Sequence, residues 1–410
     1  MKPVAGAERV QVWLVDSTVH AEGGPTAPVE VWGLLPAERL YRTFRAAGVS
    51  EEQIVTGTSR PPVLPESPLL VFRTDYVFDE RLVRALLEKS LESGGVRSLA
   101  LGDPATPATI VAVVTTGSQI ETLLPCLTTP VPVGAVQREH LPRRVPADLV
   151  PAYSSTLRKY DPPYLLRVCA NSLTQVENRM FRSSYKGITD VVTKWVWPLP
   201  ARAVTRLLAR VHVSPNLVTG LSWMLVGVAT WLFIQGQFGL GLVCAWLMTF
   251  LDTVDGKLAR VTCTSSRMGH VLDHGLDLVH PPFWYVAWAM GLMGSFSPAL
   301  IWYDPVVAII IGGYILGRLL EGVFLLAFHL EIHSWRRIDS LFRTITARRN
   351  PNLILLTLGT FVGRPGLGFW FVAVWTVCSL GFHTLRLGQA CIQRWRGRPI
   401  QTWQEAGTQA

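Results

Sequence analysis

Apolar residues follow two different patterns along the 410-residue chain. Up to about residue 185, short apolar runs alternate with amphipathic stretches of helical period. Short runs bounded by polar residues are typical of buried strands, so this alternation predicts an α/β domain with a mainly parallel sheet, covering residues 1–185. The expected strands are 10–15, 68–78 and 109–117, and the expected helices are 37–49 and 79–95.

Beyond residue 212 the apolar segments are much longer. A helix needs about 20 predominantly apolar residues to cross a bilayer, and polar extensions can complete a shorter segment. The pattern therefore predicts an α-helical polytopic membrane domain with six transmembrane helices at 213–392, followed by a tail at 393–410. The expected spans are 217–235, 238–251, 278–297, 305–328, 352–366 and 367–390.

The segment that joins these two regions, residues 186–212, mixes apolar and cationic side chains. Tryptophans and leucines alternate there with Lys194, Arg202, Arg206 and Arg210. Such a composition is typical of a juxtamembrane amphipathic helix whose cationic side chains reach lipid phosphates. The alternative is an ordinary linker helix packed on the N-terminal domain.

The charged residues support a membrane location and give an orientation. Only 16% of the residues are charged, against about a quarter in a soluble protein. Arginine-rich loops mark the cytoplasmic side of a membrane protein. Both termini and the polar segment 251–277 are therefore expected on the cytoplasmic side of a bacterial-type inner membrane. The arginines that give this orientation are Arg336, Arg337, Arg343, Arg348, Arg349, Arg394, Arg396 and Arg398.

Net charge and cysteines exclude other classes of protein. The formal net charge of +9 suits anionic lipid headgroups or nucleotide phosphates. The sequence contains no zinc-finger, RRM or basic-helix pattern, so nucleic acid is not an expected partner. The six cysteines are scattered without a CxxC pair, which predicts reduced thiols. No apolar signal segment follows Met1, so we expect the N-terminal domain to stay in the cytoplasm.

Four aspartates lie in the polar segment "LDTVDGKLARVTCTSSRMGHVLDHGLD", residues 251–277, between two apolar stretches. Asp252 and Asp255 are three residues apart, and Asp273 and Asp277 are four apart, so each pair shares one helix face. Carboxylates that converge repel each other unless a cation compensates them. Oxygen ligands without cysteine or histidine favour Mg²⁺ or Mn²⁺. A solvated acidic turn would explain one or two of these aspartates, but not all four.

The pattern D-x2-D-G-x2-A-R-x8-G-x3-D-x3-D, from Asp252 to Asp277, is similar to the signature of the CDP-alcohol phosphotransferase family. The resemblance covers about residues 200–390 and includes "SPNLVTG" at 214–220. It implies a metal-dependent enzyme of phospholipid synthesis, commonly a homodimer. In this family, an alcohol hydroxyl attacks the phosphorus distal to cytidine in a CDP-linked donor, and CMP leaves.

The resemblance also implies residue roles. Asp252, Asp255 and Asp273 would ligate one or two divalent ions, and Asp277, also close to the metal, would be the general base. The residues implied to contact or adjoin the cytidine nucleotide are Asn216, Gly256, Ala259, Arg260 and Gly269.

The sequence leaves the acceptor open. The "DHG" at 273–275 resembles choline and ethanolamine phosphotransferases, which implies a CDP-aminoalcohol donor and diacylglycerol. The fused N-terminal domain instead resembles members that use CDP-diacylglycerol or CDP-inositol with inositol phosphates. His274 is a candidate for proton removal or for hydrogen-bonding support. Arg318, Arg348 and Arg349 are candidates to bind a phosphate on the acceptor, or else are ion-pairing and topology-setting charges.

The N-terminal domain resembles cytidylyltransferases in "LPAERLYRTFRAAGVSEEQIV" and "LLVFRTDYVFDERLVRALLE". The family's metal-binding aspartate would be Asp75. A glycine-rich phosphate loop should follow the first strand, but "STVHAEGGPTAPVEVW" lacks its glycine spacing. We therefore expect a degenerate domain with a structural Asp75. A bifunctional enzyme with an active N-terminal domain is an alternative, and so is a non-enzymatic membrane scaffold.

Overall fold

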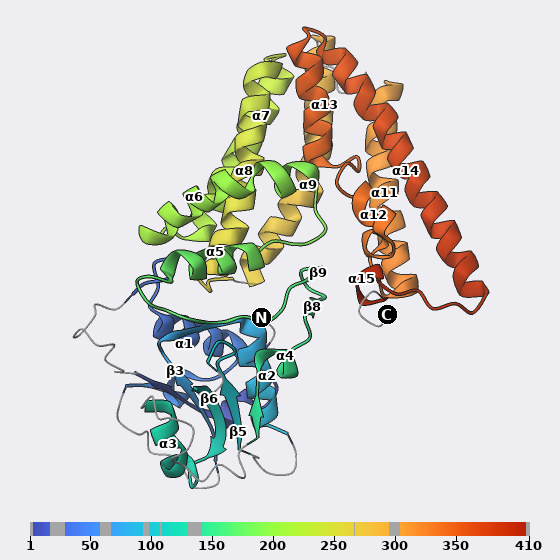
Figure 1. Cartoon of the computed structure of the whole chain (residues 1–410). Helices are drawn as coiled ribbons and strands as arrows, with labels where there is room; N and C mark the ends of the chain where they lie inside the picture. Colours follow the sequence, from blue (N-terminus) through green and yellow to red (C-terminus); the bar gives the residue numbers. More distant parts are fainter. Residues whose placement is uncertain are drawn as a thin grey trace. The chain divides into compact units, whose positions relative to one another are not determined.

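The structure is a computed structural model that describes residues 3–16, 29–57, 67–92, 98–106, 109–128, 142–265, 267–294 and 304–406. Within these ranges, the side chains of 125–126, 128, 267–274, 276–277 and 405–406 are not described. The chain divides into two compact units, shown in Figure 1. The first comprises Met1–Ser154, Tyr160–Ser184 and Arg260–Thr264, and the second comprises Ser155–Lys159, Tyr185–Ala259 and Ser265–Ala410.

The first unit is built on a six-stranded sheet with the order β2-β1-β3-β6-β5-β7. Its strands are β1 (Gln11–Val15), β2 (Ile54–Thr56), β3 (Pro68–Arg73), β5 (Leu99–Gly102), β6 (Ile110–Thr116) and β7 (Arg143–Arg144). β1 pairs in parallel with β2 and β3, and β5 pairs in parallel with β7. β6 runs antiparallel to both β3 and β5. Five strands of this sheet therefore run in the same direction and β6 opposes them, so the sheet is mainly parallel, as the sequence predicted, with one antiparallel strand.

The strand expected at 68–78 is also different in the structure. A turn at Thr74 and Asp75 divides it into β3 and a separate strand, β4 (Tyr76–Phe78). β4 leaves the main sheet and pairs with β10 (Leu165–Arg167). Two further short strands, β8 (Tyr153–Ser154) and β9 (Lys159–Tyr160), form a ribbon. Asp75 therefore lies in a turn between strands that belong to different sheets.

Helices cover both faces of the main sheet. Because side chains alternate along a strand, Leu14 and Phe72 pack with Phe44 and Leu86 on one face, whereas Trp13 packs on the opposite face. The first face is covered by α1 and α2, and the second is covered by α3. The helices of this unit are α1 (Pro36–Ala47), α2 (Glu80–Ser90), α3 (Ile120–Thr128), α4 (Pro146–Leu149) and α5 (Leu173–Ser183). This arrangement agrees with the α/β fold predicted for the N-terminal region.

The second unit is helical. α7 packs against α9, and α14 packs against both α11 and α13. Its core contains Phe233, Met248, Trp284, Trp288 and Val372. Its elements are a π-helical turn (Val192–Val196), α6 (Pro198–Arg210), α7 (Pro215–Ile234), α8 (Phe238–Val261), α9 (Arg267–Met293), α11 (Pro305–Phe328), α12 (Arg337–Phe342), α13 (Arg349–Phe361), α14 (Pro365–Trp395) and α15 (Trp403–Ala406).

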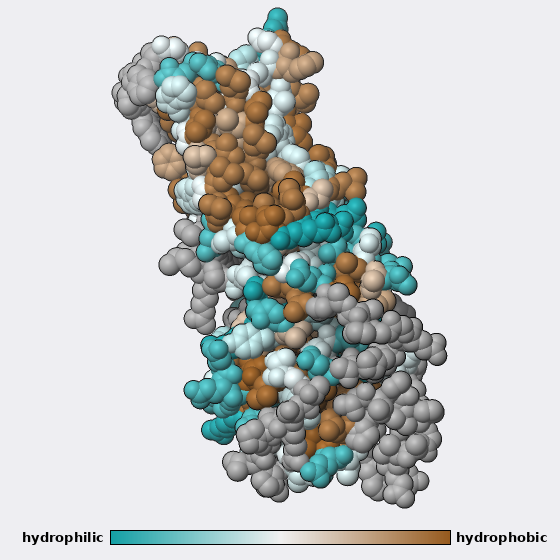
Figure 2. All heavy atoms as spheres, turned by 90° about the vertical axis from the view of Figure 1, so that its left-hand side faces the viewer, coloured by the Kyte–Doolittle hydropathy of each residue, from teal (hydrophilic) through white to brown (hydrophobic). Residues whose placement is uncertain are grey.

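Four helices among the described residues, α7, α8, α11 and α14, are long and apolar enough to cross a membrane. Figure 2 shows apolar side chains gathered on one face of this helical unit. α13 has only 13 residues. Of the expected span 278–297, residues 278–293 form the second half of α9, and residues 295–297 lie outside the described residues. The full set of six spans therefore stays a prediction.

α6 lies within the segment predicted to be a juxtamembrane helix. It buries small residues at a spacing of four, Ala201, Thr205 and Ala209. Leu199 and Leu207 are exposed, at 74% and 62%. An apolar side that is not covered by the protein is typical of a helix at a membrane surface, and this interpretation also stays a prediction.

Candidate functional site

Two of the four predicted aspartates lie near the C-terminal end of α8, where Asp255 is buried and the side chain of Asp252 is 10% exposed. Asp255 is only 4% exposed, and its Oδ2 accepts a hydrogen bond of 2.6 Å from the Thr219 hydroxyl on α7. Asp252, one turn earlier, accepts a hydrogen bond of 2.6 Å from Arg349 Nη2, on the first residue of α13. Three helices therefore meet at this pair of carboxylates.

The helix that carries them is apolar over most of its length and polar over its last turns. A β-carbon added at Gly256 would meet no atom within 4 Å, so there is open space beside Asp255. Ala259 lies on the same helix. Arg260 donates a hydrogen bond of 2.8 Å to the carbonyl oxygen of Ser184. Gly256, one of the small residues predicted to accommodate a ligand, therefore leaves room in the structure.

For the other predicted residues, the structure gives mainly the helix on which each one lies. Gly269, Asp273, His274 and Asp277 lie on α9, and their side chains fall outside the described residues. Asn216 is exposed in the first turn of α7. The structure thus brings together Asp252, Asp255, Thr219 and Arg349, of which sequence analysis missed Thr219.

The donor set fits a hard divalent cation. Carboxylate oxygens are the side-chain ligands that Mg²⁺ and Mn²⁺ prefer. Asp252 and Asp255 supply two of them from adjacent turns of one helix, in a buried position where uncompensated charge is costly. The guanidinium of Arg349 compensates the charge of Asp252 in this structure.

The adjacent residues Arg348 and Arg349 bind different carboxylates. Arg349 contacts Asp252, whereas Arg348 Nη2 donates to Glu321 Oε2 at 2.6 Å. Sequence analysis had grouped both as candidates for binding the acceptor. In the structure, only Arg348 belongs to the cluster of Arg318 and Glu321.

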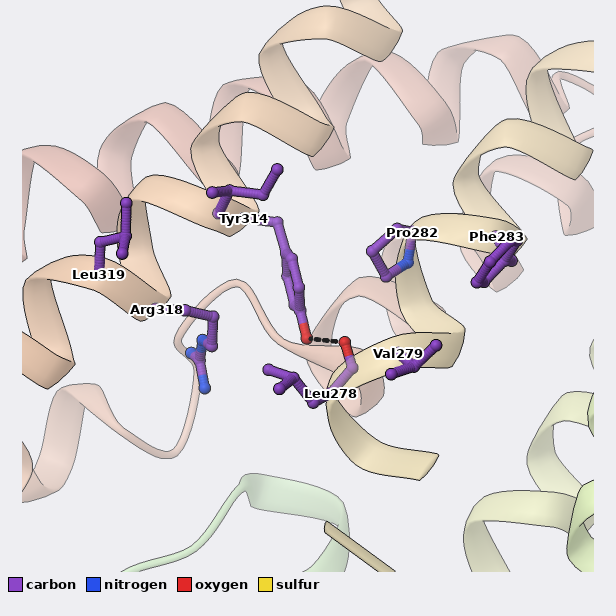
Figure 3. Close-up of a pocket in the computed structure, with 8 residues that line it drawn as sticks. Leu278, Val279, Pro282, Phe283, Tyr314, Arg318 and Leu319 are labelled. Atoms are coloured by element: carbon purple, nitrogen blue, oxygen red, sulfur yellow. Dashed lines mark hydrogen bonds between the residues drawn. The ribbon is translucent and has the colours of Figure 1, made fainter. Parts of the chain in front are cut away.

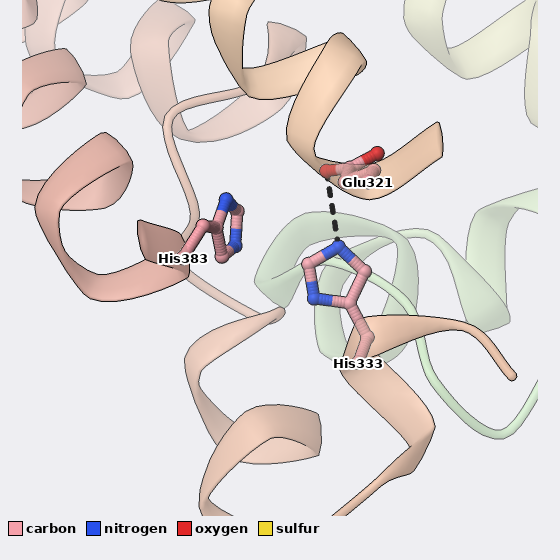
Figure 4. Close-up of side chains that lie close together, drawn as sticks. All are labelled: Glu321, His333 and His383. Atoms are coloured by element: carbon pink, nitrogen blue, oxygen red, sulfur yellow. Dashed lines mark hydrogen bonds and ion pairs between the residues drawn. The ribbon is translucent and has the colours of Figure 1, made fainter. Parts of the chain in front are cut away.

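Glu321 on α11 is the centre of this second cluster. Its Oε1 accepts hydrogen bonds from Arg318 Nη2, at 2.8 Å, and from the His333 ring, at 3.2 Å. Figure 4 shows His333 and His383 approaching Glu321 from other segments. One ligand atom from each of Glu321, His333 and His383 lies within 4.8 Å of the others. The two histidines are distant from Glu321 in the sequence, and no local pattern indicated them.

Electrostatics favour an anion over a metal ion at this cluster. Arg318 and Arg348 already bind Glu321, and a third guanidinium, Arg343, has a buried Nη1 atom. Burial and the nearby Arg348 lower the pKa of Arg343 to about 9. Two unit charges 4 Å apart interact by about 4 kcal/mol near a protein surface, so a divalent cation would meet strong repulsion. An anion such as phosphate suits these arginines better.

Burial also lowers the pKa of His333 well below its usual value, against the raising effect of its hydrogen bond with Glu321. The ring is therefore neutral at physiological pH. A neutral ring that binds a carboxylate through Nε2 must donate its proton there. His333 thus adds a donor to the cluster and no positive charge.

Arg318 also lines an apolar groove between α9 and α11, with a volume of about 350 Å³. Figure 3 shows Tyr314, which donates a hydrogen bond of 2.9 Å to the carbonyl oxygen of Leu278. Pro282 lies four residues after Leu278, and it has no N–H to satisfy this carbonyl. Tyr314 therefore replaces the missing helical hydrogen bond. The groove is lined by Leu278, Val279, Pro282, Phe283, Tyr314, Ile315, Arg318 and Leu319.

We expect Tyr314→Phe to lower the thermal stability of the protein in detergent. The carbonyl of Leu278 would lose its partner, at a cost of about 1 kcal/mol. In a Pro282→Ala background, the new N–H could bind this carbonyl, and the same change should then cost less. Equal losses of melting temperature in both backgrounds would show that the hydrogen bond does not carry the effect.

In the first unit, Asp75 is held by arginines. Arg73 binds both of its carboxylate oxygens, at 2.9 and 2.7 Å, and Arg167 lies 3.6 Å away. The carboxylate is thus engaged within the turn, in agreement with the structural role predicted for it. The relationship to nucleotidyltransferases stays a prediction.

Comparison with known proteins identifies a family profile that matches part of the chain. The sequence profile described as CDP-alcohol phosphatidyltransferase matches residues 212–346. Archaetidylinositol phosphate synthase of Pyrococcus horikoshii is 29% identical over 116 residues, which cover 28% of this chain and 57% of that protein. The bifunctional IPC transferase and DIPP synthase of Rubrobacter xylanophilus is 28% identical over 158 residues, which cover 38% of this chain and 32% of that protein. The matches therefore span only part of each relative.

Among solved structures, the phosphatidylinositol phosphate synthase of Mycobacterium tuberculosis with CDP-DAG bound superposes with a TM-score of 0.36. The two sequences are 20% identical, and the match covers 46% of this chain and 92% of that one. The family profile includes Asp252, Asp255 and the rest of the predicted signature through Asp277. This match confirms the family that the signature predicted: the chain carries a CDP-alcohol phosphatidyltransferase domain, which spans residues 212–346.

Proposed function

We propose that the protein transfers a substituted phosphate from a CDP-linked donor to an alcohol and releases CMP, in phospholipid synthesis. The observation that carries this proposal is the pair Asp252 and Asp255, one turn apart on α8 and largely shielded from solvent, within the family signature. Four long apolar helices in the described residues support an integral membrane protein. A site on the cytoplasmic side and a homodimer are parts of the same proposal.

The four aspartates Asp252, Asp255, Asp273 and Asp277 would hold one or two Mg²⁺ or Mn²⁺ ions. When bound, such ions neutralise charge on the attacked phosphate and on the leaving group. Thr219 fixes the orientation of Asp255 through its hydrogen bond. The residues proposed to bind or adjoin the cytidine nucleotide are Asn216, Gly256, Ala259, Arg260 and Gly269.

The proposed reaction exchanges one P–O bond for another. The acceptor oxygen bonds to the phosphorus distal to cytidine, and the bond from this phosphorus to the bridging oxygen breaks. CMP leaves with that bridging oxygen and its electron pair. Asp277 takes the proton of the acceptor hydroxyl as general base, and His274 is a candidate to support it.

The cluster around Glu321 favours a phosphorylated alcohol as acceptor, and therefore CDP-diacylglycerol as donor. Arg318 and Arg348 bind Glu321, and Arg343 lies near both Glu321 and Asp190, so three guanidinium groups meet two carboxylates and positive charge is in excess. Guanidinium groups bind phosphate through paired hydrogen bonds. The arginines, rather than the names of the relatives, carry this choice of acceptor. Transfer from a CDP-aminoalcohol to diacylglycerol is the alternative.

We expect Arg348→Gln to raise the KM for a phosphorylated acceptor by about tenfold or more, because a hydrogen bond to a charged group contributes about 1.5–3 kcal/mol. The assay is CMP release by the purified protein with Mn²⁺ and CDP-diacylglycerol, at varied inositol phosphate or glycerol phosphate. Arg337→Gln is a matched control, because Arg337 is exposed and stacks on Trp403. Its KM should stay within twofold of the wild type.

Two outcomes would contradict the assignment of the acceptor. One is an unchanged KM in Arg348→Gln. The other is CMP release from CDP-ethanolamine or CDP-choline with diacylglycerol, and none with a phosphorylated alcohol. The second outcome would leave the reaction class intact and establish the alternative.

A further inference from the structure

We propose that Arg349 is an internal counter-ion of Asp252, which leaves this carboxylate when a divalent cation binds and then becomes available to the donor's diphosphate. This inference rests on the proposed function, because it takes Asp252 as a metal ligand. It assigns Arg349 to the donor side of the reaction, rather than to the acceptor cluster of its neighbour Arg348.

The contact is short and shielded from solvent. Arg349 Nη2 lies 2.6 Å from Asp252 Oδ2, and the two side chains are 15% and 10% exposed. A second nitrogen, Nη1, lies 3.9 Å from the sulfur of Met248, one turn earlier on α8. The guanidinium therefore lies along the face of α8 that leads to the aspartates.

A metal ion and this guanidinium compete for the same carboxylate. Arg349 uses Asp252 Oδ2, so a cation bound through either oxygen of this carboxylate would lie within a few ångströms of the guanidinium. Two unit charges at 4 Å repel by about 4 kcal/mol at the dielectric of a protein surface, and a divalent ion doubles this repulsion. One of the two cations must move away, and the side chain of an arginine is long and has many rotamers.

The surrounding structure allows the side chain to move while its backbone stays in place. Arg348, the preceding residue, is anchored to Glu321. Asn350, the following residue, donates a hydrogen bond of 2.9 Å to Asp190. Hydrogen bonds from Asn350 and Thr193 outweigh the effect of burial and lower the pKa of Asp190, so its carboxylate remains charged. Anchors on both sides thus fix the start of α13 and leave the guanidinium of Arg349 as the movable group.

Displacement of Arg349 from Asp252 would also bring its positive charge close to the donor's diphosphate. Because Arg349 is the first residue of α13, whose backbone stays in place, its released guanidinium remains close to the aspartates. The donor brings a diphosphate to these aspartates, and arginine is well suited to bind phosphate oxygens. The exchange involves no covalent step: Asp252 changes its cationic partner, and Arg349 changes its anionic one.

The test is Mn²⁺ binding to the purified full-length protein without nucleotide, measured from the EPR signal of free Mn²⁺. We expect Arg349→Gln to bind Mn²⁺ about tenfold more tightly than the wild type, since losing a competing interaction of about 1.4 kcal/mol changes affinity tenfold. Arg349→Lys keeps the positive charge with fewer hydrogen-bond donors, so its Mn²⁺ affinity should lie between those of the wild type and Arg349→Gln. Arg348→Gln is the matched control and should leave Mn²⁺ affinity unchanged, because Arg348 binds Glu321.

A second readout tests the role toward the donor. With saturating Mn²⁺, Arg349→Gln should bind CDP-diacylglycerol more weakly than the wild type. Without metal, its melting temperature should be lower, and Mn²⁺ should raise it by more than it raises that of the wild type. These melting curves also establish that the variant folds.

Equal or weaker Mn²⁺ binding by Arg349→Gln would overturn the counter-ion role, and unchanged affinity for the donor would overturn the role toward the diphosphate. In both cases, the proposed function would still stand if the wild type binds Mn²⁺ and Asp252→Asn does not. If neither the wild type nor Arg349→Gln binds Mn²⁺, the proposed function fails as well.

Discussion

Asp255→Asn should reduce acceptor-dependent CMP release by at least about a thousandfold, while the protein keeps its fold. The change removes one negative charge from the proposed metal site and keeps an oxygen that can accept from Thr219. A metal ion contributes several kcal/mol to the stabilisation of charge in the transition state, and about 4 kcal/mol corresponds to a thousandfold change in rate. The measurement is CMP release in detergent with Mn²⁺, together with a melting curve.

Asp304→Asn provides a control with the same chemical change. Asp304 caps the N-terminus of α11 by accepting a hydrogen bond from the backbone N–H of Val306. Asparagine caps helices about as well as aspartate, so this variant should retain activity within twofold. If Asp255→Asn releases CMP at the wild-type rate, Asp255 has no role in catalysis. A rate that falls only in parallel with the melting temperature would indicate a structural role.

Asp339→Asn should destabilise the helical unit by about 3 kcal/mol or more, the usual cost of breaking a buried ion pair. Arg386 Nη2 lies 2.8 Å from Asp339 Oδ2, and its Nε donates to Oδ1. Asp339 is only 1% exposed, and the guanidinium stacks on Trp335 at 4.4 Å. Asparagine would leave a buried guanidinium without its charged partner. The effect should appear as a lower melting temperature in detergent.

Glu38→Gln serves as the comparison for an exposed ion pair. Glu38 and Arg42 are one helical turn apart on α1, with side chains that are 44% and 32% exposed. Pairs of this kind contribute well under 1 kcal/mol, so the melting temperature should barely change. Because an apolar replacement of a buried pair is often neutral, Asp339→Leu with Arg386→Met should recover stability. A melting temperature of Asp339→Asn equal to that of the wild type would contradict the account of this ion pair.

Local sequence patterns predicted individual elements better than their arrangement. The apolar run at 10–15 corresponds to β1, and the amphipathic stretch at 37–49 corresponds to α1, which ends before Gly48 with φ of 103°. The direction of β6 depends on tertiary pairing with β3 and β5, and apolar runs carry no information on strand direction. The break at Thr74 and Asp75 was missed because apolar residues resume at Tyr76, directly after the short polar stretch 73–75.

In the candidate site, too, local spacing was predicted from the sequence and the contacts between helices were not. The spacing of Asp252 and Asp255 follows from helical periodicity, and the structure places both on α8. The partners of charged side chains depend on how helices pack. The sequence therefore gave no means to separate Arg348 from Arg349, although they bind carboxylates on α11 and α8, respectively. Thr219, His333 and His383 were missed for this reason, since each joins its cluster from a distant segment.

The central claim is that this domain transfers a substituted phosphate from a CDP-linked donor at the aspartate site. The most direct test is CMP release by the purified wild-type protein with Mn²⁺, with each donor combined with each acceptor. The donors are CDP-diacylglycerol, CDP-ethanolamine and CDP-choline, and the acceptors are inositol phosphate, glycerol phosphate, serine and diacylglycerol. We predict CMP release from CDP-diacylglycerol that requires both a phosphorylated alcohol and the divalent ion. If no combination releases CMP, and the protein binds neither CDP nor Mn²⁺, the claim is contradicted.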